Sequence, residues 1–500
     1  MRPSLRRACA ACAKYKASCD LGTPRCSRCI KRRVECVYAN QPLPSTQAPS
    51  RAPAGQSQCR PLSIPPFEQV AKINDRFGSV DPFESYPPTR LPRTHVQRLI
   101  HSFLHKIAFE YYPLDLSATS NPFLVSWWPL ALGDPALFHV SLQTACLDEE
   151  LLAQKGFHAS EILMADSVAL LRRKVLYPSL AVQDGTMNSV ITLAAIEFGK
   201  GNILTSQMHV DGVKRLVGMR GGINAVRQTS PLTARMISWV SMLVMGHPQF
   251  PTQDDQGIGD GIPLVPEWQV DLMSSSHPIN NPDLLGVLDL TTDPQVRGVL
   301  IRLRAAFDRA QQAPLSSTRL HDLTCFVIHR LLLSAPDATG LAVPESPITE
   351  SIRYAVILYM FIIHGPTYYS HAVIMGSVVA RLVNALAHLD DSPRAQEYVL
   401  LDVWITAIGL VASANTPHTL WFAKKAQSLV ESLQLQSWDD VLLHLRGVLW
   451  LETGHCEQIF RLYWDPVLAA IPAYQGPEAN LVDMSIPLTW APLGRLRVES

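Results

Sequence analysis

Two short stretches decide the fold of this chain: Cys9-Ala-Ala-Cys12-Ala-Lys-Tyr-Lys-Ala-Ser-Cys19 and Cys26-Ser-Arg-Cys29-Ile-Lys-Arg-Arg-Val-Glu-Cys36. Two, six, six, two and six residues separate the successive cysteines. The second stretch therefore repeats the first after 17 residues. The repeat extends to charge, since Lys14 and Lys16 correspond to Lys31 and Arg33. Such a repeat predicts a unit built from two equivalent halves.

The number of cysteines limits how metal ions can be bound. Structural zinc takes four ligands in a tetrahedron, so two separate sites would need eight thiolates. The segment has six cysteines, and two arrangements remain. Either one ion binds and two thiols are left over, or two ions share two bridging thiolates. The repeat favours two equivalent ions. A disulfide framework is disfavoured, because we expect no secretory signal and therefore a compartment that keeps thiols reduced.

The net charge of zero hides an asymmetric distribution. Residues 1–40 carry ten Lys and Arg against Asp20 and Glu35, a balance of +8. The rest of the chain carries 33 basic and 41 acidic residues. Two zinc ions and six thiolates sum to −2, so the small module keeps a charge of about +6. A basic segment joined to an acidic body is typical of a nucleic-acid-binding arm attached to a regulatory domain.

The remaining chain divides into three segments. Residues 41–94 are rich in Pro, Ser, Gln and Ala, which predicts a flexible linker. Residues 95–470 show helical periodicity, and residues 471–500 are predicted to be coil. The longest apolar runs reach about ten residues, whereas a membrane span needs ~20, so we expect no membrane partner. The predicted fold class is all-α: a zinc module, a flexible linker and a large helical regulatory domain. The predicted helices are His95–Tyr112, Pro135–Gln154, Ser160–Val175, Met187–Phe198, Thr205–Met219, Thr233–Met245, Gln295–Ala313, Thr318–Leu333, Ile348–Ile363, Ala372–Leu389, Tyr398–Ala412 and Thr419–Leu433.

The cysteine pattern resembles that of the fungal zinc binuclear cluster (Zn2Cys6) transcription factors. Pro24 matches the proline that turns the chain between the half-clusters of that family. The resemblance implies two zinc ions per chain, with Cys9 and Cys26 as bridging ligands. The zinc ligands are Cys9, Cys12, Cys19, Cys26, Cys29 and Cys36. The resemblance also implies that the helix after Cys12 presents its N-terminal end to the major groove.

The same resemblance places Lys16 where the family reads a CGG-type triplet, and a lysine can donate to guanine O6 and N7. The full set of predicted DNA contacts is Lys14, Lys16, Arg25, Arg28, Lys31, Arg32 and Arg33. The sequence departs from the family at Ala13, Tyr15 and Ser18, where basic residues are common. Because phosphate contacts set affinity, we expect weaker binding than a typical member shows.

The helical body resembles the fungal-specific transcription factor domain over most of residues 80–470. The best match is His209-Val-Asp-Gly-Val-Lys-Arg-Leu-Val-Gly-Met-Arg-Gly-Gly222, a predicted helix that ends in a glycine pair. Glycine adopts the left-handed cap at a helix C-terminus at little cost. The resemblance implies a regulatory role without identifying an effector.

Motifs of catalysis are missing from the sequence. It has no HExxH, GxSxG or Walker-type loop. Gly257-Ile-Gly-Asp-Gly261 follows two aspartates, which makes it a poor phosphate cradle and predicts a plain loop. We expect Trp127–Trp128 to fill core or an interhelical groove. We interpret His364 and His371 as core or surface residues. The isolated cysteines are expected to be buried and structural, and they are Cys59, Cys146, Cys325 and Cys456.

These observations predict a nuclear, sequence-specific regulator of RNA polymerase II transcription that binds double-stranded DNA and recruits co-regulators or the transcription machinery. An alternative is a cofactor that uses its zinc module mainly for protein contacts. A second alternative, an enzyme in the helical body, lacks any acid, base or nucleophile constellation. A homodimer would form through the helical domain, because Pro66, Gly78 and Pro82 leave barely two heptads for a coiled coil after the cluster.

Overall fold

The computed structural model describes residues 10–15, 27–34, 86–154, 156–269, 291–335, 346–390 and 399–470, together with 286 and 289. The chain divides into two compact units, residues 1–80 and 81–500. Within the described ranges the regular elements are helices, and the only pairing of extended backbone is an isolated bridge between Thr252 and Ile262. The all-α prediction is confirmed. Residues 41–85 and 471–500, which hold most of the predicted linker and the predicted coil, lie outside the described residues.

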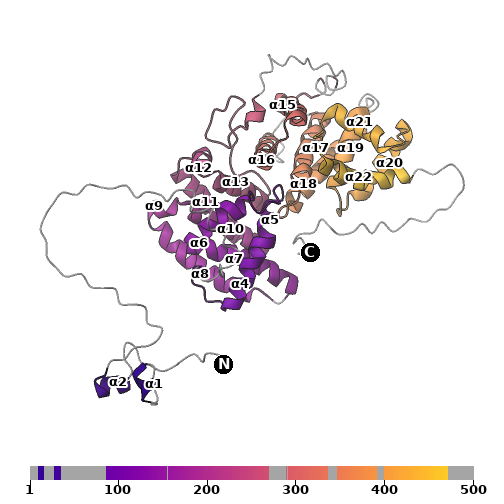
Figure 1. Ribbon diagram of the computed structural model, residues 1–500. Helices are drawn as coiled ribbons and strands as arrows, with labels where there is room; N and C mark the ends of the chain where they lie inside the picture. Colours follow the sequence, from indigo (N-terminus) through magenta and orange to yellow (C-terminus); the bar gives the residue numbers. More distant parts are fainter. Residues whose placement is uncertain are drawn as a thin grey trace. The chain divides into compact units, whose positions relative to one another are not determined.

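The first half of the larger unit is arranged around two buried helices, α7 (Pro135–Ala153) and α10 (Asp184–Gly199) (Figure 1). Every side chain from 136 to 148 and from 185 to 197 is buried. Asp134 caps α7 by accepting hydrogen bonds from the backbone N–H groups of Ala136 and Leu137, and Pro135 fits the first helical position. The surrounding elements are α4 (Arg93–Ser102), η1 (Phe103–Ile107), α5 (Ala108–Tyr111), η2 (Phe123–Trp127), α6 (Trp128–Gly133), α8 (His158–Val175), α9 (Pro178–Ala181), α11 (Ile203–Met219), α12 (Ile223–Thr229) and α13 (Pro231–Met245).

The second half is arranged around α17 (Pro347–His364) and α19 (Val399–Ala412). From Tyr354 to Ile363 the sequence of α17 is apolar on all sides, which is typical of a helix segment that neighbours surround completely. The elements packed around them are η3 (Pro266–Trp268), α15 (Pro294–Gln312), α16 (Ser317–Leu333), α18 (Ala372–Asp390), α20 (Thr419–Leu433), α21 (Trp438–Val448) and α22 (Gly454–Ala469).

The predicted helices agree with the observed ones to within about three residues at each end. The prediction of Thr419–Leu433 matches α20 at both ends. The largest differences are at the starts of helices such as α10, which begins at Asp184 rather than Met187. The folded unit also begins earlier than residue 95. Tyr86 stacks on Phe138 with 5.7 Å between ring centroids, and Leu91 is buried.

Helix α18 is long and apolar enough to cross a membrane by length and composition alone, and it is the one such helix in the described part of the chain. It packs against α17 and α19, and 33% of its apolar window is buried inside the protein.

A buried ion cluster fastens α12 and α13 to α16. Asp322 accepts hydrogen bonds from Arg227 Nη1 at 2.8 Å and from Arg235 Nε at 2.8 Å. Burial alone would raise the pKa of the Asp322 carboxyl. The two guanidinium groups outweigh burial and lower that pKa to about 2. The charge of Asp322 is therefore kept inside the protein only because both arginines remain in place.

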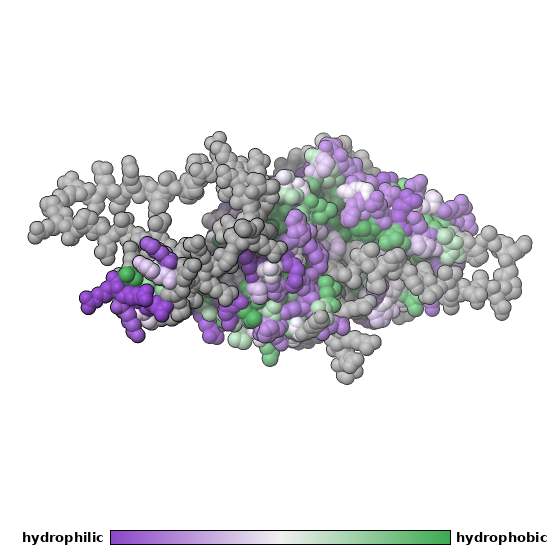
Figure 2. Space-filling view, turned by 60° about the horizontal axis from the view of Figure 1, so that its bottom comes forward, coloured by the Kyte–Doolittle hydropathy of each residue, from purple (hydrophilic) through white to green (hydrophobic). Residues whose placement is uncertain are grey.

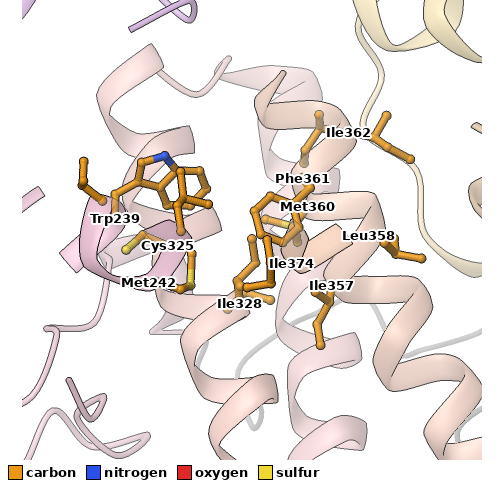
Figure 3. Packing of buried hydrophobic residues seen from close by; sticks show 14 of the residues in the cluster. Trp239, Met242, Cys325, Ile328, Ile357, Leu358, Met360, Phe361, Ile362 and Ile374 are labelled. Atoms are coloured by element: carbon orange, nitrogen blue, oxygen red, sulfur yellow. The ribbon is translucent and has the colours of Figure 1, made fainter. Parts of the chain in front are cut away.

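The two halves meet around Trp239 of α13, in the region shown in Figure 3. The ring centroids of His364 and His371 lie 4.5 and 5.6 Å from that of Trp239. Nδ1 of His364 donates to the backbone oxygen of Gly365 at 3.2 Å, so its Nε2 accepts from His321 Nδ1 at 2.9 Å. Nε2 of His364 can accept this hydrogen bond only while the His364 imidazole is neutral. Burial lowers the pKa of His364 to about 4 and, together with the neighbouring His364, that of His371 to about 3.

Because these histidines are buried and neutral, we predict that acid lowers the stability of the packing between the two halves. An unfolded histidine binds a proton near pH 6.5, whereas the folded His371 does not until about pH 3. The folded state therefore loses stability as pH falls below about 6.5, and His371 alone contributes a loss of about 2 kcal/mol by pH 5. Urea unfolding of the full chain at pH 7.5 and pH 5.0 measures this loss. His371→Gln should flatten the dependence, and His101→Gln at an exposed position should not. Equal stability at both pH values would contradict the prediction.

Candidate zinc centre and DNA-binding surface

The smaller unit contains two short helices at equivalent positions of the sequence repeat. Helix α1 covers Ala10–Lys14 and α2 covers Ser27–Arg32, so the two begin 17 residues apart. Each begins one residue after the first cysteine of its half. Cys12 and Cys29 occupy the same position in the two helices, and the helices contact each other. The equivalence predicted from the cysteine spacing is thus present in the described backbone.

The burial pattern of this unit fits a metal centre. Cys12 is 3% exposed and Cys29 2%, whereas Tyr15 and Ile30 are about 60% exposed, at 60% and 59%. Among the described residues of the unit, Cys12 and Cys29 are the buried ones. A segment of this size cannot form an apolar core large enough to fold it. Zinc coordination produces this pattern, because it draws the thiolates inward and leaves apolar side chains outside.

The remaining predicted ligands, Cys9, Cys19, Cys26 and Cys36, lie outside the described residues. Their assignment as ligands, and that of Cys9 and Cys26 as the bridging pair, stays a prediction. When zinc is bound, it supplies the folding energy that the missing apolar core cannot. The chain's own contribution is to hold Cys12 and Cys29 on two helices that contact each other.

The end of α2 is fixed by a hydrogen-bonded cap. The backbone N–H of Val34 donates to the Cys29 oxygen at 3.1 Å, and that of Arg33 donates to the Ile30 oxygen at 3.2 Å. This pair of bonds is the Schellman motif, in which the residue after the C-cap takes the left-handed conformation. Arg33 has a φ of 52° there, although glycine is usual. A basic side chain thus occupies a position where the backbone favours glycine.

The described basic residues form an exposed surface. Figure 2 shows the coloured part of this unit mostly in hydrophilic purple. Two of the predicted DNA contacts, Lys16 and Arg25, lie outside the described residues. The predicted contacts that are described are all exposed, and they are Lys14, Arg28, Lys31, Arg32 and Arg33. The α2 half therefore carries four of these five exposed charges, while α1 carries Lys14 alone.

The prediction about the first helix needs a correction. The family resemblance implied a helix that follows Cys12 and presents its N-terminal end to DNA. In the structure Cys12 lies inside α1, which already includes Ala10 and Ala11. Alanine has the highest helix propensity, so the helix extends back toward Cys9. Lys14 is consequently the last residue of α1, and the basic residue lies at its C-terminal end.

The larger unit contains no comparable centre in its described residues. No group of three or more His, Cys, Asp and Glu side chains there could hold a metal ion. Cys146, Cys325 and Cys456 are buried, and burial raises the pKa of each thiol to about 12. The burial of these three thiols agrees with the prediction, and Cys59 lies outside the described residues. His364 and His371 are buried, in agreement with the core interpretation.

The glycine-rich loop near residue 257 has a structural role. Asp255 forms ion pairs with Arg330 at 2.8 Å and with Arg302 at 3.3 Å. Asp254 accepts hydrogen bonds from the backbone N–H groups of Gln256 and Ile258. Both carboxylates are thus occupied by the protein itself, which agrees with the prediction of a plain loop. Trp127 is also structural: it is 1% exposed and its indole N–H donates to Ser141 Oγ at 2.9 Å.

Comparison with known families identifies two domains in this chain. The model of the fungal Zn(2)-Cys(6) binuclear cluster domain matches residues 7–45. The model of the fungal specific transcription factor domain matches residues 98–255, which corresponds to the first half of the larger unit and is narrower than the predicted 80–470. No curated protein and no solved structure matches the chain significantly. The binuclear cluster domain binds two zinc ions, which confirms the predicted cofactor.

The conformation of Arg33 leads to a prediction about zinc retention. Arg33→Gly and Arg33→Ala both remove the charge, but only glycine relieves the left-handed backbone, which costs an L-residue roughly 1–2 kcal/mol. We expect the glycine variant of the full chain to release zinc to a competing chelator less readily than the alanine variant. Both should lose the same amount of DNA affinity. Identical zinc retention in the two variants would show that the backbone of Arg33 is not strained.

Proposed function

We propose that this transcription regulator, which carries a zinc binuclear cluster domain and a fungal specific transcription factor domain, recognises CGG-like triplets in double-stranded DNA. The observation that carries the proposal is the arrangement of the small unit. Two equivalent helices direct thiols inward and place basic side chains outward. Such a module offers cations to the phosphates of a nucleic acid.

Within this proposal the basic residues have two different roles. Lys16 donates to guanine in the major groove and supplies the sequence preference. Lys14, Arg25, Arg28, Lys31, Arg32 and Arg33 contact phosphates and supply affinity, which depends on salt. The six cysteines hold the zinc ions, with Cys9 and Cys26 shared between them.

The proposal gives each segment of the chain its own role. Residues 1–40 bind DNA, and residues 41–94 link them to the helical domain. Residues 95–470 receive regulatory contacts from co-regulators or the transcription machinery. The site of action is the nucleus and the genes are those of RNA polymerase II. The chain is not an enzyme in this proposal, since the thiols of Cys146, Cys325 and Cys456 are buried, and His321, His364 and His371 are buried and held in structural hydrogen bonds.

A second candidate function is that of a cofactor whose zinc module contacts proteins. The observation that favours it is the exposed surface of α1, where Lys14 is accompanied by the exposed ring of Tyr15 rather than by further cations. Aromatic side chains are enriched at protein interfaces. Selection of duplexes from a random pool by the full zinc-loaded protein separates the two functions. Enrichment of CGG triplets supports the first, and no enrichment supports the second.

Two substitutions test the division of roles. Lys16→Ala should lower discrimination between CGG-bearing and scrambled duplexes by about 1–3 kcal/mol, because a base contact is lost. Lys31→Ala should weaken binding to both duplexes equally and reduce the salt dependence, because a phosphate contact is lost. Competition binding with the full chain at two salt concentrations measures both effects. Arg173→Ala, at an exposed position of α8, is the matched control and should change neither. Unchanged discrimination by Lys16→Ala would remove the proposed role of that residue.

A further inference from the structure

Helix α11 has one buried face and one exposed face that no described element covers. Its buried side chains, such as Val213 and Leu216, pack on the helical core with α10 and α13. The opposite face carries large apolar side chains in solvent: Leu204 is 79% exposed, Met208 72% and Met219 56%. A helix at a protein surface normally presents charged and polar residues there. This exposed apolar content indicates a face that packs against something else.

The exposed face also carries two charges that the protein leaves without a partner. Asp211 and Arg215 are both exposed and lie one helical turn apart between the apolar residues. Neither forms an ion pair or a side-chain hydrogen bond with another described residue, in contrast to the many paired arginines of this unit. An acid and a base that remain available on one face can each accept an opposite charge from outside.

The spacing of the face follows a heptad pattern. Leu204, Met208, Asp211, Arg215 and Gly218 succeed one another at intervals of four, three, four and three residues. In the heptad notation Met208 and Arg215 are a positions, and the other three are d positions. When two such helices pack antiparallel, a positions of one face d positions of the other. Asp211 then lies opposite Arg215 of the other helix, and Met208 lies opposite Gly218.

We infer that the exposed face of α11 binds a second copy of this chain by antiparallel pairing of the two α11 helices. The charge pattern is self-complementary, because one register satisfies both Asp211 and Arg215 of each copy. A C2 interface requires such self-complementarity. The register also suits the side-chain volumes. A Cβ built on Gly218 would meet nothing within 4 Å, so the face is open there for Met208 of the other copy.

The inference deepens the proposed function, because a dimer brings two zinc modules to one DNA site. It does not depend on DNA binding and is tested without DNA. The contact is small, so we expect a weak dimer that forms at roughly 100 µM protein. A protein that dimerises but ignores DNA would remove the proposed function and leave the inference intact. A monomer that binds DNA would do the opposite.

Charge reversal on the full zinc-loaded chain tests the pairing. Asp211→Arg places two arginines opposite each other, and Arg215→Asp places two aspartates opposite each other. Each variant alone should raise the dimer dissociation constant by about tenfold or more in sedimentation equilibrium, because like charges face each other twice. The double variant D211R/R215D restores opposite charges and should recover the dimer. An equimolar mixture of the two single variants should form a heterodimer for the same reason.

Controls separate pairing from folding. All substituted positions are exposed, so thermal unfolding should be unchanged in every variant. Arg173→Asp reverses an equally exposed charge on α8 and should leave the dimer unchanged. The inference is overturned if the wild-type chain stays monomeric at this concentration, which would leave the face to a different protein. It is equally overturned if the dimer persists in both single variants, or if the mixture and the double variant stay monomeric.

Discussion

The burial of Cys12 and Cys29 is the constraint on which the DNA-binding unit depends. A segment of about forty residues cannot exclude enough apolar surface from water to offset its conformational entropy. Here Tyr15 and Ile30 remain exposed, and the thiols of Cys12 and Cys29 are directed inward. Metal–thiolate bonds therefore replace the hydrophobic core, and the exterior becomes available for charge. Because metal–thiolate bonds hold the unit together, it can tolerate several exposed cations close together on α2 although it is small.

The helical unit has a large apolar interior that can stabilise its fold. Its unfavourable contribution is the desolvation of the polar groups that are buried with the apolar ones. Asp322 remains charged because Arg227 and Arg235 hold it, while His321 and His364 remain neutral and hydrogen-bonded to each other. The ion cluster and the histidine pair both lie where the two halves meet. The junction therefore depends on protonation states, whereas the centres of α7, α10 and α17 depend mainly on packing.

The sequence allowed the zinc module, the all-α class and most helices to be predicted, because spacing and periodicity are local signals. The repeat of 17 residues predicted that Cys12 and Cys29 would be equivalent, and α20 was predicted at both ends. The conformation of Arg33 could not be predicted, since a left-handed arginine has no residue signature. Asp322 likewise gave no sign of its partners, which are about ninety residues away. The start of α1 was misjudged because the family pattern outweighed the helix propensity of Ala10 and Ala11.

Helices α11 and α2 end in the same cap motif but carry different residues at its left-handed position. Helix α11 ends in a Schellman motif with Gly221 in the left-handed position, and α2 ends in the same motif with Arg33 there. The first choice is the stable one, and the second keeps a cation on the proposed DNA-binding surface at the expense of backbone strain. The first cysteine stretch, residues 9–19, carries only Lys14 and Lys16 as cations, so it offers few contacts to phosphates, and this limits the affinity proposed for one triplet. Joining two modules through the helical unit raises the effective concentration of the second after the first has bound. In the proposed dimer, the weak charge of α1 and the exposed face of α11 are two parts of one arrangement, in which affinity comes from pairing rather than from a single module.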